Sequence, residues 1–138
     1  MKAEPPDPRA LGLPALAAKA RWARRRAHAP FSGFKVGAAL RGPRSVTLGA
    51  NVEAATYGLT VCAERVAVWK AVTEGVKKFD AIAVVTDAKR VTPPCGACRQ
   101  VLWELCGDIW VHVANTRGQS RTMRLSELLP LPFDRRNL

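Results

Sequence analysis

Three cysteines in two short segments constrain the fold of this chain more than any other feature: Cys62 in one, and the pair Cys95 and Cys98 in the other. Zinc takes tetrahedral sulfur and nitrogen ligands, and a catalytic zinc site leaves one of its four positions open for water. Three thiolates with the neighbouring, unligated Glu64 therefore predict a catalytic zinc site. Any fold of this chain has to bring the two segments together.

The composition is that of one folded domain. The chain has 138 residues, of which 48% are apolar and 24% charged, an ordinary globular composition, and we interpret residues 1–138 as a single domain. The proline-containing start is followed by no apolar run that suits a signal peptide or the roughly 20 residues of a membrane span. We therefore expect a cytoplasmic protein without a membrane partner, whose cysteines serve metal or redox chemistry rather than disulfides.

The net charge of +11 raises the question of nucleic-acid binding, because a run of arginines over residues 21–26 resembles a phosphate-binding patch. The basic residues are scattered along the chain, however, and we find no aromatic residues interleaved with them as a stacking platform. Residues 15–26 also fit an amphipathic helix with a solvated charged side. Nucleic acid is therefore not an expected partner. An RNA-binding zinc module is the weakest alternative, since Cys106 is not spaced to complete a second Cys-x-x-Cys pair.

Turn signals divide the chain into one alternating unit. Helices are predicted over residues 11–27, 60–73 and 96–106, and strands over residues 34–40, 45–51, 81–85, 109–113 and 121–125. Ser126 is expected to cap a last turn over residues 127–129. The order hairpin, helix, strand, helix, strand predicts an α/β fold, a mixed sheet of about five strands with helices on both faces. Ligands are expected beyond the carboxyl ends of its parallel strands.

This arrangement gives the cysteines a shared position. Cys62 falls at the amino end of the second helix, and Cys95 and Cys98 fall at the amino end of the third, one turn apart. Neighbouring crossover helices start at the same edge of a sheet, so the two segments are expected to meet there. Helix amino ends also stabilise anions, which favours the thiolate that zinc requires.

The segments in which these residues lie resemble the small zinc-dependent cytidine deaminases, which act on free cytidine and deoxycytidine. The similar segments follow in the family's order: PFSGFKVGAA (residues 30–39), NVE (51–53), CAER (62–65), PCGACRQ (94–100), and LLP (128–130) followed by Phe133. Three cysteines resemble the cytidine branch, since deoxycytidylate and nucleic-acid deaminases have histidine at the first position. The resemblance implies a three-layer cytidine-deaminase-like fold, one Zn²⁺ per subunit on Cys62, Cys95 and Cys98, and a homotetramer.

The same resemblance implies a hydrolytic mechanism. Zinc lowers the pKa of its bound water, which then attacks C4 of the pyrimidine. Glu64 takes the proton of the water, delivers it to ring N3 and protonates the departing ammonia. Three thiolates call for a compensating cation, and the family counterpart of Arg65 hydrogen-bonds the ligand sulfurs. Gln100 is a further predicted neighbour of the ligands.

The resemblance assigns substrate contacts to Phe34, Asn51, Glu53, Ala63 and Phe133. Asn51 and Glu53 are one residue apart as the second strand ends, so their side chains share a face, and the family uses them for the ribose 3′-hydroxyl. A carboxylate there also repels phosphate, which favours a free nucleoside. Phe34 and Phe133 are expected around the base, Phe133 from a neighbouring subunit.

Two substrate classes remain open. The first is cytidine and deoxycytidine, in pyrimidine salvage; the second is an aminonucleoside antibiotic such as blasticidin S, against which Glu53 argues. Phe31 and Ala54 depart from the family's usual tyrosine and asparagine, which leaves substrate range and subunit contacts open. We interpret Cys106 as a core residue and His112 as a structural one.

Overall fold

Five strands form one mixed sheet in the computed structural model, which describes residues 7–138. The strands are β1 (Gly37–Arg41), β2 (Val46–Ala50), β3 (Ala81–Thr86), β4 (Trp110–Asn115) and β5 (Ser120–Arg124). Their order across the sheet is β2-β1-β3-β4-β5. β3 and β4 run parallel, and every other neighbouring pair is antiparallel. The predicted mixed sheet of about five strands is confirmed.

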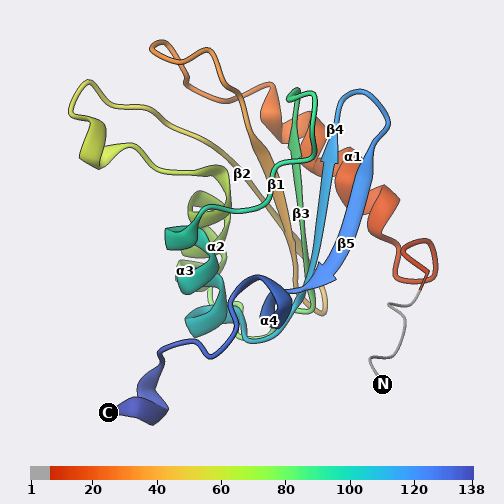
Figure 1. Cartoon of the computed structure of the whole chain (residues 1–138), viewed down its shortest axis with the longest axis vertical. Coiled ribbons are helices and arrows are strands. Elements are labelled where there is room, and N and C mark those ends of the chain that lie inside the picture. Colours follow the sequence, from red (N-terminus) through yellow and green to blue (C-terminus); the bar gives the residue numbers. More distant parts are fainter. Residues whose placement is uncertain (1–6) are drawn as a thin grey trace.

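Helices cover both faces of this sheet (Figure 1). α1 (Leu13–Arg24) lies on one face and buries Leu13, Leu16, Ala20 and Ala23 against it. α2 (Ala63–Thr73) and α3 (Gly96–Cys106) lie on the other face. β3 is buried along its whole length because both of its faces are covered. The three-layer arrangement is therefore confirmed.

Two glycines let the helices approach the sheet closely. A Cβ at Gly37 in β1 would stand 1.9 Å from the carbonyl oxygen of Ala20 in α1. A Cβ at Gly49 in β2 would stand 2.4 Å from the carbonyl oxygen of Ala63, the first residue of α2. Real Cβ atoms do not show such distances. The amino end of α2 can therefore lie this close to β2 only because residue 49 is glycine.

Several element boundaries differ from the sequence expectation by one to three residues, and contacts made in the folded chain account for two of the larger differences. α2 begins at residue 63 rather than 60, since residues 57–59 form a 3-10 turn and Val61 pairs with Val52. β1 begins at residue 37 rather than 34, since the Asn51 side chain holds residues 34–36 outside the ladder. α1 ends at residue 24 and not at 27.

The expected cap at Ser126 is wrong. β5 runs directly into α4 (Leu125–Leu128), so Arg124 occupies the N-cap position. The Glu127 carboxylate accepts a hydrogen bond from the Arg124 amide at 2.7 Å, and the Asp108 carboxylate accepts one from the Ser126 amide at 2.8 Å. The free amides of this helix end are thus satisfied by acidic side chains, one of them distant in sequence.

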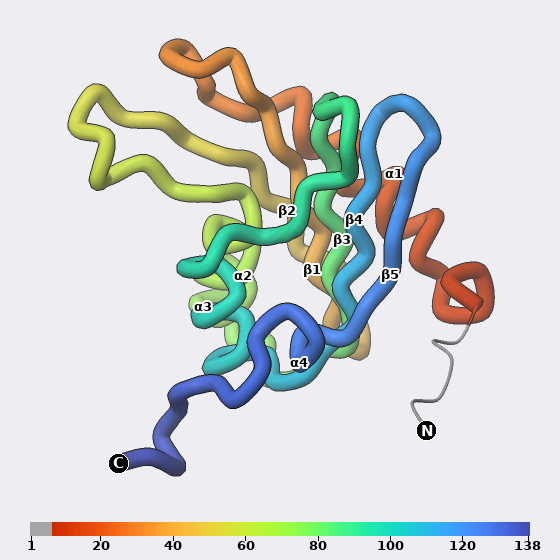
Figure 2. Tube along the Cα trace, viewed as in Figure 1, coloured from red at the N-terminus to blue at the C-terminus, as the bar shows by residue number. Residues whose placement is uncertain are grey.

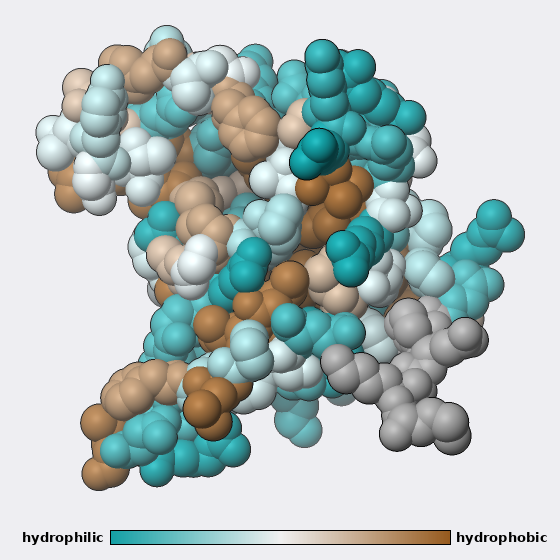
Figure 3. All heavy atoms as spheres, viewed as in Figure 1, coloured by the Kyte–Doolittle hydropathy of each residue, from teal (hydrophilic) through white to brown (hydrophobic). Residues whose placement is uncertain are grey.

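Two parts of the chain extend beyond the layers. Figure 2 shows the segment before β1 (orange) and the segment after β2 (yellow) projecting together at the upper left. The C-terminal arm, residues 129–138, leaves the body at the lower left, with hydrophobic residues at its end (Figure 3). In this arm Leu131 is 100% exposed, Phe133 59% and Leu138 95%. Of the helices within residues 7–138, none has the length and apolarity to cross a bilayer.

Candidate functional site

The three predicted zinc ligands converge at the amino ends of two helices. Cys62 is the N-cap residue of α2, Cys95 is the N-cap residue of α3, and Cys98 lies in the first turn of α3. The Sγ atoms of Cys62 and Cys95 are 3.8 Å apart, those of Cys95 and Cys98 are 3.5 Å apart, and all three lie within 4.8 Å of one another. Two thiolates on one tetrahedral zinc are separated by about 3.8 Å when the Zn–S bond is about 2.3 Å. The donor set therefore fits zinc.

Charge distribution in this cluster favours thiolate at Cys62. Hydrogen bonding with Cys98, and then with Arg65, lowers the pKa of Cys62 to about 5. The pKa of Cys98 is raised, first by its hydrogen bond to Cys62 and then by burial. Neighbouring thiolates repel one another, so a metal cation is needed before all three thiols ionise together.

Arg65 lies against the cysteine cluster. Its Nη2 donates a hydrogen bond to Cys62 Sγ at 3.5 Å. The Arg65 pKa is raised, chiefly by this hydrogen bond. Its Nε is buried without a hydrogen-bond partner among the described residues.

Glu64 lies beside the metal ligands but is not one of them. It occupies the first turn of α2, two residues after Cys62, and is only 4% exposed. Burial, and then the negative charge at Cys62, raise the pKa of Glu64 to about 7. A carboxyl group in this environment takes up and gives up a proton near neutral pH, as general acid–base catalysis requires.

A pocket of about 250 Å³ opens onto these groups. It lies at the carboxyl end of β3, where ligands are expected in an open α/β sheet. Its walls are largely apolar, with a few polar groups among them, as in small-molecule sites. The lining residues that the argument below uses are Phe34, Asn51, Glu53, Cys62, Glu64 and Cys95.

Asn51 and Glu53 line the pocket, and their side chains also hydrogen-bond to the segment at its rim. Asn51 Oδ1 accepts a hydrogen bond from the Val36 amide at 2.8 Å, and its Nδ2 donates one to the Phe34 carbonyl at 2.8 Å. The Glu53 carboxylate accepts hydrogen bonds from the amides of Phe31 and Ser32 at 3.0 and 3.1 Å, and one from the Ser32 hydroxyl. Asn51 and Glu53, which the sequence analysis assigned to substrate binding, therefore also hold the segment that carries Phe34 in place.

Ser32 and Arg99 are functional neighbours that sequence reasoning did not single out. The Ser32 hydroxyl is the main cause of the lowered pKa of Glu53. Arg99 donates to the Pro94 carbonyl at 2.7 Å and to the Leu128 carbonyl at 2.9 Å, which ties the segment before Cys95 to α4. Both lie in motifs that the sequence displays, but their partners are distant in the chain.

A family comparison agrees with this geometry. The family described as the cytidine and deoxycytidylate deaminase zinc-binding region matches residues 14–113. The chain belongs to this family.

Relatives and solved structures of this deaminase family resemble most of the chain. A cytidine deaminase of Halalkalibacterium halodurans is 54% identical over 113 residues, 80% of this chain and 86% of that protein. The crystal structure of cytidine deaminase from Burkholderia pseudomallei superimposes with a TM-score of 0.84 at 46% identity, covering 86% of this chain and 97% of that one. A blasticidin-S deaminase of Bacillus cereus is 34% identical over 109 residues, 72% of this chain and 77% of that protein.

Two of the residues proposed for the deaminase site lie outside the pocket of a single chain. Phe133 belongs to the C-terminal arm and does not line the pocket. Ala63 is completely buried, with its carbonyl oxygen against Gly49. Phe34, by contrast, lines the pocket as expected.

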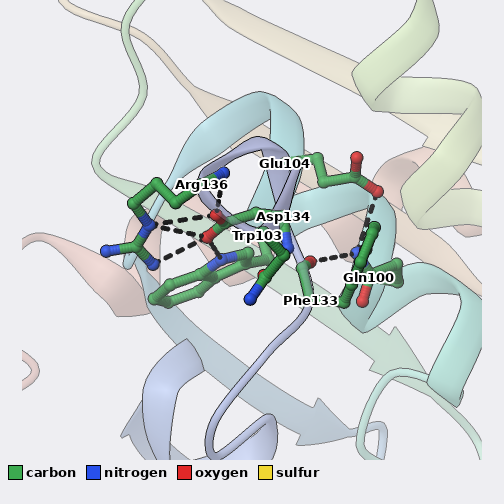
Figure 4. Close-up of polar contacts among 7 residues, drawn as sticks. Gln100, Trp103, Glu104, Phe133, Asp134 and Arg136 are labelled. Atoms are coloured by element: carbon green, nitrogen blue, oxygen red, sulfur yellow. Dashed lines mark hydrogen bonds and ion pairs between the residues drawn. The ribbon is translucent and has the colours of Figure 1, made fainter.

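The structure corrects the expectation for Gln100 (Figure 4). Its Nε2 donates to the Glu104 carboxylate at 2.9 Å and to the Phe133 carbonyl at 2.8 Å, away from the ligand sulfurs. The reason is helical geometry: two residues after Cys98, a side chain is rotated by about 200° from the ligand face. Trp103 lies one turn beyond Gln100 and donates its indole N–H to Asp134 at 2.9 Å. The outer side of α3 thus holds the C-terminal arm.

Cys106 is not part of the metal cluster formed by the described residues. It is partly buried against the core, and burial raises its pKa to about 12. The interpretation as a core residue agrees with this position. His112 is buried in β4, where its Nδ1 lies 2.7 Å from the Thr122 hydroxyl.

Proposed function

We propose that this protein catalyses the hydrolytic deamination of cytidine and deoxycytidine to uridine and deoxyuridine, with release of ammonia. The observation that carries the proposal is a cluster of three cysteine sulfurs beside a small pocket, which Cys62, Cys95 and the buried carboxyl group of Glu64 line. Zinc on three cysteines keeps one coordination position free for water. The deaminase family match supports the same reaction.

The chemistry divides between the metal and the protein. Zinc held by Cys62, Cys95 and Cys98 supplies Lewis acidity that makes a water molecule nucleophilic at neutral pH. Glu64 accepts a proton from the attacking water at its carboxylate and passes it to ring N3; it then takes the remaining proton of the hydroxyl added at C4 and gives it to the leaving amino group. Because its carboxyl is buried, these transfers occur away from bulk water. Arg65 offsets part of the negative charge of the three sulfurs.

Substrate recognition follows from the rim of the pocket. The Glu53 carboxylate receives three hydrogen bonds from Phe31 and Ser32, and a carboxylate offers about four acceptor sites, so one is left for a ribose hydroxyl. The two backbone contacts of the Asn51 side chain use its Oδ1 and one hydrogen of its Nδ2, so the second hydrogen is available to the substrate. Phe34 lines the wall beside them. A negative Glu53 repels a phosphate at the same place and thus favours free nucleosides.

We further propose a homotetramer in which Phe133 completes a neighbouring site. The exposed arm supports this arrangement, because Leu131, Phe133 and Leu138 present apolar side chains outside the fold of their own chain. Sedimentation velocity at several protein concentrations tests it, and a monomer would contradict it. Cytoplasmic location and a place in pyrimidine salvage remain predictions of the sequence.

Blasticidin S is the second candidate substrate, favoured by the similarity to a deaminase of that antibiotic. The deciding experiment incubates the zinc-loaded protein with cytidine, deoxycytidine, cytidine monophosphate and blasticidin S in parallel. Ammonia release and the change in absorbance of the pyrimidine are followed. Turnover of both free nucleosides is expected, with little turnover of the monophosphate. Turnover of blasticidin S alone would contradict the proposal.

A variant tests the role of the carboxyl group. Glu64→Gln keeps the volume of the side chain but not its proton transfer, so deamination should fall by about 10²-fold or more, with the zinc content unchanged. Glu74→Gln is the matched control, because Glu74 is exposed at the far end of the same helix. Equal activity of Glu64→Gln and wild type would defeat the assigned role.

A further inference from the structure

The carboxyl-terminal half of α1 carries a concentration of positive charge that the deaminase reaction does not use. Lys19, Arg21, Arg24, Arg25 and Arg26 lie within eight positions of one another, and the helix contains no acidic residue. Arg24 pairs with Asp87 at 2.9 Å. Of the ion pairs formed within residues 7–138, none involves the other four cations. This charge is therefore open to an external anion.

Three of these cations line a concave surface. A cleft of about 660 Å³ lies between α1 and the segments that follow β3 and β4. Three guanidinium groups, those of Arg21, Arg24 and Arg25, face it, and Asp87 is the one carboxylate in its wall. Because Asp87 is already paired with Arg24, the cleft keeps a positive balance. A cleft lined by charge of one sign concentrates counter-ions.

Trp22 adds an aromatic group to this surface. The side chain is 49% exposed, and the Arg26 guanidinium lies 5.0 Å from the centre of its ring. Trp22 also borders a second cleft, of about 460 Å³, whose cations are Arg26 and Lys70. The ring therefore stands between two clefts that both carry positive charge. Sequence reasoning found no aromatic platform among the arginines, but the helix places Trp22 in that position.

We propose that this surface, here called the α1 basic surface and made of Lys19, Arg21, Trp22, Arg25 and Arg26, binds single-stranded nucleic acid. Proteins bind single-stranded nucleic acid without sequence preference through cations that contact its phosphate backbone and exposed aromatic rings on which its bases stack. Phosphates contact the guanidinium groups, and a base stacks on Trp22. The surface is separate from the zinc site, since α1 covers the opposite face of the sheet from α2 and α3 (Figure 1).

An acidic membrane fits the α1 basic surface less well. A helix that lies on a bilayer inserts an apolar face opposite its cations. The apolar residues Leu13, Leu16, Ala20 and Ala23 of α1 are buried. Trp22 is the single large apolar side chain that the described helix α1 exposes. Phosphate contacts with stacking therefore account for the surface better than insertion into lipid.

The binding assay uses the zinc-loaded full chain and a fluorescently labelled oligouridylate of roughly 12 nucleotides, a length within the usual site size. Uracil has no exocyclic amino group, so the deaminase reaction does not consume this probe. Four phosphate contacts predict a slope of log affinity against log salt of about −3 and a loss of about 50-fold between about 50 and 200 mM salt. Oligothymidylate is run beside it, because the proposed contacts are shared by RNA and DNA.

Two double variants of equal charge change locate the contact. Arg21→Glu with Arg25→Glu should weaken binding by at least about tenfold and make the salt slope less negative by about 1.4. Lys77→Glu with Lys78→Glu, on an exposed segment at the other end of the sheet, should weaken binding by less than about threefold. Trp22→Ala should cost about tenfold. Wild-type rates of cytidine deamination in all variants show that they fold.

Three results would overturn the proposal. The first is an absence of binding to both oligonucleotides at about 50 mM salt, where phosphate contacts are strong. The second is an equal loss of affinity in the two double variants, which assigns the effect to net charge. The third is binding to vesicles rich in phosphatidylserine without binding to either oligonucleotide, which assigns the surface to a membrane.

Discussion

Replacing Gly49 with alanine tests how closely the sheet controls the catalytic site. The added Cβ would stand 2.4 Å from the Ala63 carbonyl oxygen and 2.6 Å from the Ala67 amide nitrogen, both backbone atoms of α2. No side-chain rotation relieves these contacts, so the start of α2 has to retreat by about 1 Å to reach the ordinary contact distance of 3.4 Å. Cys62 and Glu64 flank Ala63 and move with it.

The displacement has two expected consequences. Overpacking of a well-packed contact costs about 1–3 kcal/mol of unfolding free energy. A displacement of about 1 Å in a reacting group lowers the catalytic rate by about 10²-fold. Cytidine turnover, zinc content and the thermal midpoint are measured for Gly49→Ala. Gly58→Ala is the control, because a Cβ there meets no atom within 4 Å, and it should leave all three unchanged. Wild-type turnover and midpoint in Gly49→Ala would refute the reasoning.

Three further perturbations test separate features. Cys98→Ala should abolish stoichiometric zinc binding, whereas Cys106→Ala should keep one zinc per chain and lower the unfolding free energy by about 1 kcal/mol. A colorimetric zinc assay measures the metal content of both variants. Loss of zinc from both would contradict the ligand assignment. Trp103→Phe removes the hydrogen bond to Asp134. Proteolysis of the C-terminal arm should therefore accelerate, while the unfolding free energy falls by less than about 1.5 kcal/mol. An unchanged cleavage rate would contradict the attachment of the arm to α3 through Trp103. Burial lowers the pKa of His112. The neutral ring therefore stabilises the fold fully above the unfolded pKa of about 6.5, and this contribution falls below that pH by at most about 1.4 kcal/mol per pH unit. Denaturant titrations at pH 7.5 and 5.5 should show that the unfolding free energy depends less on pH in His112→Gln than in wild type, and an equal pH dependence would contradict this role.

Much of the fold was predictable because the relevant signals are local. Apolar runs and the glycines and prolines between them predicted five strands and three long helices, and the structure contains all of these; the 3-10 turns at residues 57–59 and 135–137 were not predicted. Cys62, Cys95 and Cys98 were placed at helix amino ends by the same patterns, and the right-handed crossover rule brought those ends together. The boundaries at residues 34 and 60 and the cap at residue 126 were wrong, because the side chains of Asn51 and Asp108 and the pairing of Val61 with Val52 act there from other segments of the chain.

The sequence by itself determined the donor atoms and the layers: three thiols and one carboxyl group at fixed spacings, in a chain whose hydrophobic periodicity allows a covered mixed sheet. Tertiary structure alone decided what each neighbouring group touches. Gln100 turned from the predicted ligand face to the C-terminal arm, Glu53 was engaged by Ser32, and Trp22 came to stand between two basic clefts. Helical and strand periods depend on local backbone geometry and can be read along the chain. Side-chain partners depend on distances between segments remote in sequence, which exist only once the chain is folded.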